Sequence, residues 1–332
     1  MNSRQPIASL SLDLDNRWSY LKVHGDPEWQ QFPSYLDVLI PRVLDFLGEW
    51  NLRITFFVVG QDAAFEINHR PLRMISAAGH ELGNHSFSHE PWFHLYSQQR
   101  VESEIALAED LINKVTGQRP VGYRAPGFSL TESTLQVLEK RGYTYDASTF
   151  PTFIGPLARL YYLSRSGLTG RGRAERSLLF GSLSDGIRPL RPYRWPGRQG
   201  IVEIPVSTMP LFRTPIHLSY LLYLSRFSFK LAVNYFRAAL QVSHHFSLSP
   251  SLLLHPLDFL GVDDKVGLEF FPAMELSAGQ KRQFVSEILR VYCNEFTVVP
   301  VKEHAATVLI GKSGSLGYEN QPSSFTSLTR HI

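Results

Sequence analysis

The feature that most constrains the fold of this chain is a regular alternation of strand-like and helix-like segments. Two compact β-branched and aromatic runs, at residues 7–12 and 53–59, indicate buried strands. Helical patterns follow at 35–50, 97–115, 131–141 and about 277–293, and short apolar runs at 200–206, 252–255 and 296–299. Because a strand that returns parallel to its neighbour needs a crossover, usually a helix, this order predicts a mainly parallel sheet with helices outside it. The sheet is either open or closed into a barrel.

The composition is that of a globular protein with a sizeable core. Of the 332 residues, 43% are hydrophobic and 19% are charged, which excludes a largely disordered chain. The single cysteine, Cys293, excludes an intrachain disulfide framework. We expect one domain over residues 1–310, followed by a disordered tail rich in Ser and Gly at 311–332. Neither an export signal nor a membrane-spanning run is recognisable, so we expect a cytoplasmic protein.

Two clusters of polar side chains suggest a metal site. Asp13 and Asp15 close the first strand and point to the same side of it, where two like charges need a cation or a positive partner. His85 and His89 follow a strand-like segment, and a helical turn would bring both imidazoles to one metal ion. Asp, His and His are three protein ligands with one position left open, as in catalytic zinc sites. Each cluster alone also fits a solvated turn or a surface helix.

Two further signals lie at the ends of strand-like segments. Arg124 comes shortly before Pro126, which restricts the turn and so aims the arginine. His255 ends an apolar run, and Asp258 follows three residues later. This pattern is expected where a histidine acts as a general acid and a nearby carboxylate adjusts its pKa. A surface arginine and a core histidine are the alternatives. Active sites of α/β barrels lie at the carboxyl ends of the strands, so four such signals in order make coincidence a poor explanation.

Together these motifs resemble the polysaccharide deacetylase (NodB-homology) family, in its branch with a spaced Asp-x-Asp motif. The matching segments are Asp13-Leu14-Asp15, His85-Ser86-Phe87-Ser88-His89, Arg124-Ala125-Pro126-Gly127 and Leu254-His255. The resemblance runs over about residues 7–308 outside an insert. It implies an α/β fold, the distorted (β/α)₇ barrel of this family, and the activity of a metal-dependent carbohydrate deacetylase.

The resemblance also implies roles for individual residues. Asp15, His85 and His89 would hold one divalent ion, expected to be Zn²⁺; Asp13 would act as the base, Arg124 would orient it, and His255 would act as the acid. The fourth motif of the family, which places an acidic partner and a tryptophan near the acid, matches no evident segment. Asp258 and Glu203 are the candidates for the carboxylate that tunes the acid, and Trp195 is the candidate tryptophan.

A segment at about 157–199 differs from the rest of the chain in charge. Between residues 159 and 198, nine arginines stand against two acidic residues, a balance of +7, whereas the remaining 24 basic and 28 acidic residues give −4. The net charge of +3 is therefore the sum of two opposite regions. Because guanidinium groups suit phosphate, we expect an insert that binds a phosphate, with Arg191 and Arg194 as contacts. A solvated basic loop is the alternative.

The segment at about 216–244 is rich in Leu, Tyr and Phe and predicts one amphipathic helix. Within 218–242 the only charges are Arg226, Lys230 and Arg237, which fall in a narrow stripe. That pattern is typical of a helix lying in a membrane interface, and an outer barrel helix packed against a partner is the alternative. With the insert, it suggests a substrate linked to a polyprenyl phosphate or another lipid, at the inner face of the membrane.

The sequence therefore predicts a hydrolase that removes an N-acyl group, expected to be acetyl, from an amino sugar in a glycan or a lipid-linked glycan. A lipid-linked aminosugar deformylase is the alternative within the family, and a non-catalytic glycan-binding protein is the alternative from another class. The latter should have lost Asp13, a metal ligand or His255, and none is lost. We expect no nucleic-acid partner, because the chain has no helix-turn-helix, zinc finger or stacking platform.

Overall fold

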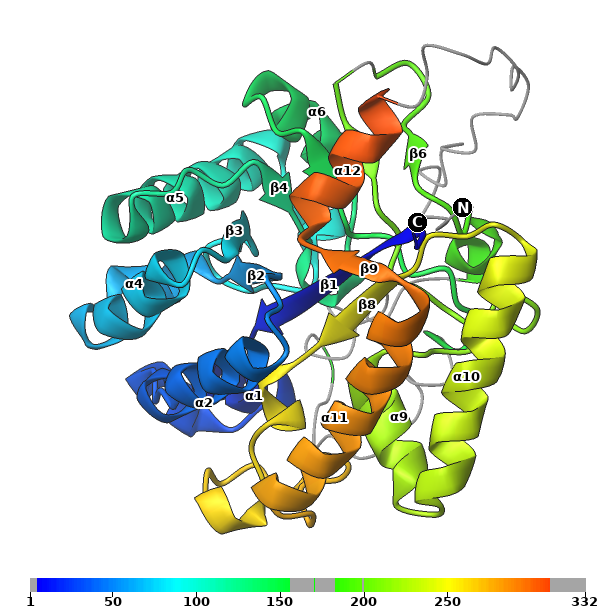
Figure 1. The fold of residues 1–332 in the computed structure, drawn as a ribbon. Coiled ribbons are helices and arrows are strands. Elements are labelled where there is room, and N and C mark those ends of the chain that lie inside the picture. The colour runs from blue at the N-terminus through cyan, green and yellow to red at the C-terminus, as the bar shows by residue number, and fades with distance from the viewer. Residues whose placement is uncertain (1–4, 156–169, 171–182, 199, 311–332) are drawn as a thin grey trace.

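A nine-stranded sheet lies at the centre of the molecule and helices surround it (Figure 1). The structure is a computed structural model, and it describes residues 5–155, 170, 183–198 and 200–310. The strands are β1 Ile7–Leu14, β2 Thr55–Val58, β3 Glu81–Asn84, β4 Gly122–Tyr123, β5 Tyr145–Asp146, β6 Tyr193–Arg194, β7 Val202–Glu203, β8 Ser251–Leu254 and β9 Thr297–Val299. Their order is β6-β7-β5-β4-β3-β2-β1-β8, with β9 paired to β1. The β6–β7 pair is antiparallel, and the other pairs described are parallel.

Helices connect successive strands and cover the outer face of the sheet (Figure 1). They are α1 Arg17–His24, α2 Leu36–Glu49, α3 Gly60–Ala64, α4 His69–Ala77, α5 Gln98–Thr116, α6 Glu132–Lys140, α9 Leu218–Ser225, α10 Phe229–His245, α11 Ala278–Glu295 and α12 Val301–Ile310. The helices expected at 35–50, 97–115, 131–141 and 277–293 are confirmed as α2, α5, α6 and α11. In the part of the chain that is described, no helix is long and apolar enough to cross a membrane.

The sheet curls into the distorted (β/α)₇ barrel expected from the sequence. Its two sides approach each other after β7, where the Ser207 amide donates to the Ser251 carbonyl oxygen at 3.0 Å and the Ser251 amide donates to Ser207 Oγ at 2.7 Å. Helix α12 covers the amino ends of the strands, since the Val301 amide donates to Thr55 Oγ1 at 2.8 Å, at the start of β2. The carboxyl ends of the strands form the opposite end of the barrel.

The alternation of side chains along β1 explains how one strand serves both the core and the barrel interior. Leu10, Leu12 and Leu14 are fully buried in the hydrophobic core between the sheet and its helices. Ser11 and Asp13 point the other way, into the barrel, where both contact Arg124. A strand with polar residues at every second position therefore remains fully buried because the interior supplies partners for them.

The single helix expected at about 216–244 is instead two helices, α9 and α10, separated by a short turn. Ser228 has an extended backbone, and its Oγ accepts from the Leu231 amide at 3.2 Å as the N-cap of α10. Both helices bury one apolar face, through Leu221 of α9 and Phe236 of α10, in the same core. The periodicity of the segment was compatible with one helix, but folding back buries more apolar surface against the barrel. The tail at 311–332 lies outside the described residues.

Candidate active site

The expected motifs lie at one end of the barrel, where the strands end. Asp13 is near the end of β1 and Asp15 directly follows it. His85 directly follows β3, Arg124 directly follows β4, and His255 directly follows β8. Because β1 pairs with β2 on one side and with β8 on the other, segments far apart in the sequence meet here.

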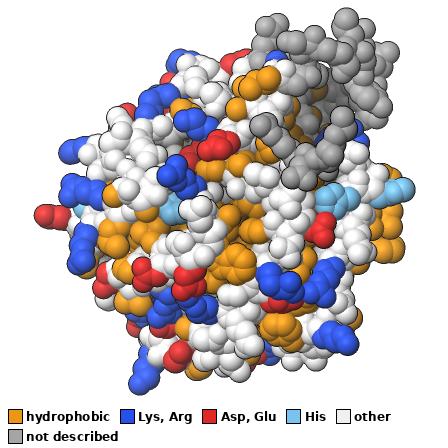
Figure 2. Space-filling view, in the orientation of Figure 1, with side chains coloured by type: hydrophobic (Ala, Val, Ile, Leu, Met, Phe, Trp, Pro, Cys, Tyr) orange, Lys and Arg blue, Asp and Glu red, His pale blue; other side chains and the backbone are white. Residues whose placement is uncertain are grey.

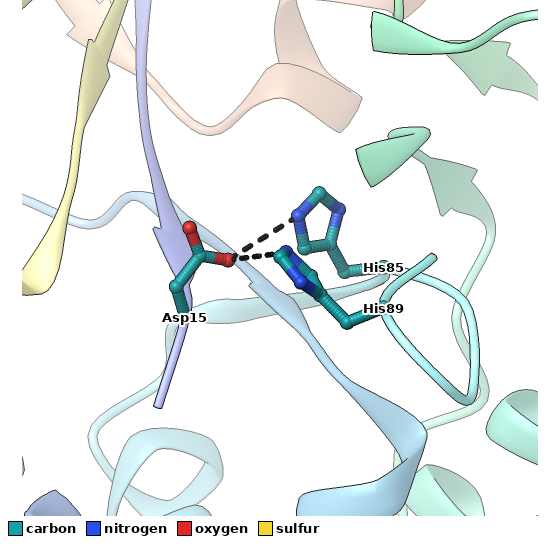
Figure 3. A group of neighbouring side chains, drawn as sticks. All are labelled: Asp15, His85 and His89. Atoms are coloured by element: carbon teal, nitrogen blue, oxygen red, sulfur yellow. Dashed lines mark ion pairs between the residues drawn. The ribbon is translucent and has the colours of Figure 1, made fainter. Parts of the chain in front are cut away.

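Asp15, His85 and His89 form a compact group of metal-ligand types (Figure 3). One possible ligand atom from each lies within 4.8 Å of the others. Asp15 Oδ1 is 2.9 Å from His89 Nε2 and 3.5 Å from His85 Nε2. A half-buried carboxylate and two buried imidazoles, close to one another, are a donor set that fits Zn²⁺ or another borderline divalent cation.

The protonation of this group reflects the close approach of its members. Burial would raise the pKa of Asp15, but the charge on His89 and hydrogen bonds from both imidazoles lower it well below its usual value. Burial would lower the pKa of His85, but the carboxylates of Asp13 and Asp15 outweigh it and raise the pKa above its usual value. The carboxylates and imidazoles of this group therefore stabilise one another's charged forms.

The two histidines are oriented differently by their surroundings. His85 Nδ1 lies 2.7 Å from the backbone oxygen of Arg124, which leaves Nε2 directed toward Asp15. Metal-ligating histidines commonly make such a second contact, because it fixes the tautomer and the ring orientation. His89 Nδ1 is buried and has no hydrogen-bond partner among the described residues. The first imidazole is therefore the more firmly oriented ligand.

His85 and His89 are brought together by a loop, and not by the helical turn that their spacing predicted. Ser86 and His89 have φ values of 60° and 51°, in the left-handed region, which interrupts any helix. The loop is tied to α5, since the Ser88 amide and Ser88 Oγ donate to the Glu104 carboxylate at 2.7 and 2.9 Å. The prediction of a helical turn was wrong because these tertiary hydrogen bonds, invisible in the local pattern, determine the backbone.

Asp13 and Arg124 form a buried ion pair beside the ligand group. Arg124 Nη1 lies 2.7 Å from Asp13 Oδ1 and also donates to Ser11 Oγ at 2.8 Å. Its Nε donates to the Ala147 carbonyl oxygen at 2.9 Å, and its guanidinium lies over the ring of Phe57 at 4.3 Å. With the arginine side chain 0% exposed, these contacts hold the Asp13 carboxylate in one orientation.

His255 is linked to Asp258 through a serine that the sequence did not suggest. Ser219 Oγ, in α9, lies 3.1 Å from His255 Nδ1 and donates to Asp258 Oδ1 at 2.7 Å. The other oxygen, Asp258 Oδ2, accepts from the His255 amide at 2.7 Å. Burial raises the pKa of Asp258, and the neighbouring His255 lowers it in part. Of the two candidate carboxylates, Asp258 is therefore the one that the structure brings to the histidine.

Glu203, the other candidate carboxylate, lies in a separate buried cluster. Its oxygens accept from Thr149 Oγ1 at 2.6 Å and from Trp195 Nε1 at 3.2 Å, and its contacts among the described residues do not include His255. Burial and the adjacent Asp146 raise the pKa of Glu203 well above its usual value, so the two carboxyl groups share a proton. Glu203 and Trp195 thus lie together on the β5–β7 side of the barrel, without a described contact to His255.

The arginine-rich insert is only partly described, and five of its nine arginines lie outside the described residues: Arg159, Arg165, Arg171, Arg173 and Arg176. Arg198 pairs with Glu132 and Glu139, and Arg188 with Asp185. Acidic and basic side chains are interspersed on the face in Figure 2. Much of the described charge of the insert is therefore neutralised within the molecule.

Neither of the two arginines predicted to contact phosphate has a described contact with the ligand group. Arg194 lies in β6, pairs with Val202 at the start of β7, and donates to the Leu309 carbonyl oxygen of α12 at 3.4 Å. Because α12 covers the amino ends of the strands, Arg194 is at the opposite end of the barrel from Asp15. Arg191, three residues earlier, has no described ion pair or hydrogen bond to that group. The geometry gives the predicted phosphate role no support.

Comparisons with known proteins confirm the family resemblance. Residues 32–145 match the family model for polysaccharide deacetylase. A peptidoglycan deacetylase of Helicobacter pylori is 35% identical over 112 residues, which are 34% of this chain and 37% of that protein. A peptidoglycan-N-acetylglucosamine deacetylase of Bacillus cereus is 30% identical over 96 residues, 29% of this chain and 34% of that protein. The matched segments thus span about a third of the length of these relatives.

The fold has a counterpart over nearly the whole chain. A crystal structure from Mycobacterium smegmatis, assigned as a polysaccharide deacetylase, superposes with a TM-score of 0.61 at 20% identity. The superposition covers 97% of this chain and 96% of that one. It therefore extends well beyond residues 32–145, which the family model matches. At this identity the likeness supports the barrel fold and no more.

Proposed function

We propose that this chain, which belongs to the polysaccharide deacetylase family, is a metal-dependent hydrolase that removes an N-acyl group, most simply acetyl, from an amino sugar. One observation carries the proposal: three ligand-type side chains converge beside a buried Asp13–Arg124 pair at the carboxyl ends of the strands. A base next to a cation site is an arrangement suited to metal-assisted hydrolysis of an amide.

Asp15, His85 and His89 would hold the divalent cation, and Zn²⁺ is the ion that this donor set favours. When bound, the cation supplies Lewis-acid chemistry, in that it polarises a carbonyl group and lowers the pKa of water. The contact between His85 and the Arg124 backbone oxygen would keep the Nε2 lone pair available to it.

Asp13 would accept the proton of the attacking water. It is well suited to this role because Arg124 and Ser11 hold its surroundings in a fixed geometry, so little reorganisation is needed in the reaction. Asp13 lies in β1, two residues before the proposed ligand Asp15, which directly follows the strand, so base and cation would lie on one side of β1.

His255 would donate a proton to the departing amine. A free amine anion is a poor leaving group, so the proton must arrive as the C–N bond breaks. Asp258, connected to His255 through Ser219, would stabilise the imidazolium and orient the ring. The same machinery would act on a formyl group, and the identity of the released acid distinguishes a deacetylase from the deformylase alternative.

We also propose a lipid-linked substrate at a membrane surface, although fewer features support it than the sequence suggested. Two cations of the expected stripe pair with carboxylates within the molecule, Arg226 with Glu275 and Arg237 with Glu287. What supports membrane contact is the α9–α10 turn, where Phe227 is 72% exposed and Leu231 is 63% exposed. Large apolar side chains at the tip of a helical hairpin suit insertion into a headgroup region.

The experiment that tests the activity is release of acetate or formate from a panel of soluble and lipid-linked N-acyl amino sugars, with and without a chelator. We expect release that a chelator stops and that added Zn²⁺ restores. No release from any member of the panel would contradict the proposed activity. Release that persists in a chelator and in His85→Ala would contradict the metal dependence.

The membrane contact is tested by flotation with vesicles of phosphatidylglycerol and phosphatidylcholine. We expect the wild-type chain to float with the vesicles and Phe227→Ser/Leu231→Ser to remain behind. Ile67→Ser is a matched control, because Ile67 is 73% exposed but lies next to α4. Equal behaviour of the wild type and the double variant would contradict contact through this turn without affecting the proposed chemistry.

A further inference from the structure

A continuous group of aromatic side chains lies at the carboxyl end of the barrel, beside the proposed acid. Phe128 follows β4, Phe150 follows β5, and His217 and Tyr220 come from the segment between β7 and β8. Ring centroids are 4.9 Å apart for Phe128 and Phe150, 5.7 Å for Phe150 and His217, and 6.2 Å for His217 and Tyr220. His217 is also 5.9 Å from His255. All five side chains are half-buried, so each keeps some accessible surface.

His217 has one ring nitrogen that is engaged and one that is not. Its Nδ1 accepts from the Tyr220 amide at 3.4 Å, as the N-cap of α9. Since Nδ1 uses its lone pair in this contact, the ring proton of the neutral imidazole is on Nε2. Nε2 has no hydrogen-bond partner among the described residues, and the side chain is half-buried. The mechanism proposed above makes no use of this donor.

The two neighbouring histidines have different electrostatic surroundings. His255 is connected to the Asp258 carboxylate through Ser219, whereas the contacts described for His217 are with aromatic rings and a backbone amide. Burial, together with the neighbouring His255, lowers the pKa of His217 to about 3. His217 is therefore a neutral hydrogen-bond donor and does not compete with His255 for a proton.

We propose that Phe128, Phe150, His217 and Tyr220 form a binding subsite for the pyranose ring of the N-acyl amino sugar, with His217 donating its Nε2–H to a sugar hydroxyl. A pyranose presents an apolar face of C–H groups and a rim of hydroxyl oxygens. Aromatic rings match the apolar face, and a neutral donor beside them matches a neutral hydroxyl. This inference rests on the proposed function for the kind of sugar, and it makes His217 a positioning residue.

The test measures binding separately from turnover. An N-acetylglucosamine oligomer is titrated calorimetrically into the Asp13→Asn variant, which keeps the three proposed ligands, and then into the same variant carrying His217→Asn. Asparagine is a good N-cap, so it preserves the contact with the Tyr220 amide, but its amide is too short to reach the position of Nε2. We expect Kd to rise roughly fivefold, the effect of one lost neutral hydrogen bond, with no change in Tm or zinc content.

Three further variants separate a subsite from a structural role. Phe150→Leu should weaken binding about 3- to 10-fold through the loss of a ring contact. His217→Gln, whose amide can reach further, should restore much of the affinity. His245→Asn is the matched control, because His245 is exposed near the end of α10, and it should leave Kd unchanged.

The outcomes distinguish this inference from the proposed function. If the wild type deacylates the oligomer but His217→Asn leaves Kd unchanged, the subsite is refuted and the chemistry stands. If the wild type releases no acid from any N-acyl sugar, yet His217→Asn and Phe150→Leu weaken binding, the subsite stands and the chemistry fails. If the oligomer does not bind, the subsite is refuted, and the proposed activity is decided separately by acid release from the whole panel of N-acyl sugars.

Discussion

Replacing Arg124 by methionine tests most directly how the barrel interior holds the candidate site. Methionine keeps much of the length and apolar surface of the side chain, so packing against Phe57 is largely retained. The change removes the 2.7 Å ion pair with Asp13 and the hydrogen bonds to Ser11 and the Ala147 carbonyl oxygen. The Asp13 carboxylate, whose side chain is 6% exposed, is then left without its cation.

The expected loss of folding stability in Arg124→Met follows from this burial. Breaking a buried ion pair by removing one partner costs about 3–5 kcal/mol, because the remaining charge stays in a poorly solvated position. That is a large part of a typical unfolding free energy of about 5–15 kcal/mol. In Asp13→Asn/Arg124→Met neither charge remains, so the double variant should be more stable than Arg124→Met by about 1–3 kcal/mol.

The assay is equilibrium unfolding in urea at pH 7, followed by circular dichroism in a chelator so that metal binding does not contribute. Arg282→Met is the matched control, because Arg282 pairs with Glu49 but its side chain is 41% exposed. This change should lower the free energy of unfolding by less than about 1 kcal/mol. The reasoning is refuted if Arg124→Met costs no more than this control. It is also refuted if the double variant is less stable than Arg124→Met.

Three other predictions concern the ligands, the acid and the pH dependence of stability. Asp13→Asn should abolish turnover but retain zinc, whereas His85→Ala should lose both; zinc in His85→Ala at the wild-type level, by elemental analysis, would contradict the ligand assignment. Ser219→Ala should lower kcat about tenfold, the effect of about 1.4 kcal/mol, with Tm nearly unchanged, because it breaks the connection from Asp258 to the proposed acid. Burial lowers the pKa of His304 from an ordinary 6.5 to about 4. Between these two pH values the unfolded chain binds a proton at His304 that the folded chain does not. The free energy of unfolding should therefore fall by about 3 kcal/mol as the pH drops from 6.5 to 4. His304→Gln should reduce this loss between pH 7 and pH 4.5 in urea unfolding, and an unchanged loss would show that other groups cause it.

The candidate active-site residues could be identified from the sequence because their motifs are short and each stands at the end of a strand. Asp13, His85, Arg124 and His255 were all found in this way, and the structure brings them to one end of the barrel. The order of strands and helices was also predictable, since apolar spacing depends on residues only a few positions apart. The partner of His255 was not, because Ser219 comes from a helix that no local pattern connects to β8.

The sequence by itself predicted the alternation of strands and helices, a barrel through the family resemblance, and the candidate active-site residues at the ends of strands. Only the tertiary structure decided that a loop, and not a helical turn, joins His85 to His89, and that Asp258, and not Glu203, serves His255. It also decided that the 218–242 segment folds back on itself, and that Arg194 lies away from the site. The physical reason is the range of the forces involved. Backbone periodicity reports near neighbours along the chain, whereas hydrogen bonds and ion pairs in the interior depend on which distant segments the curled sheet brings together.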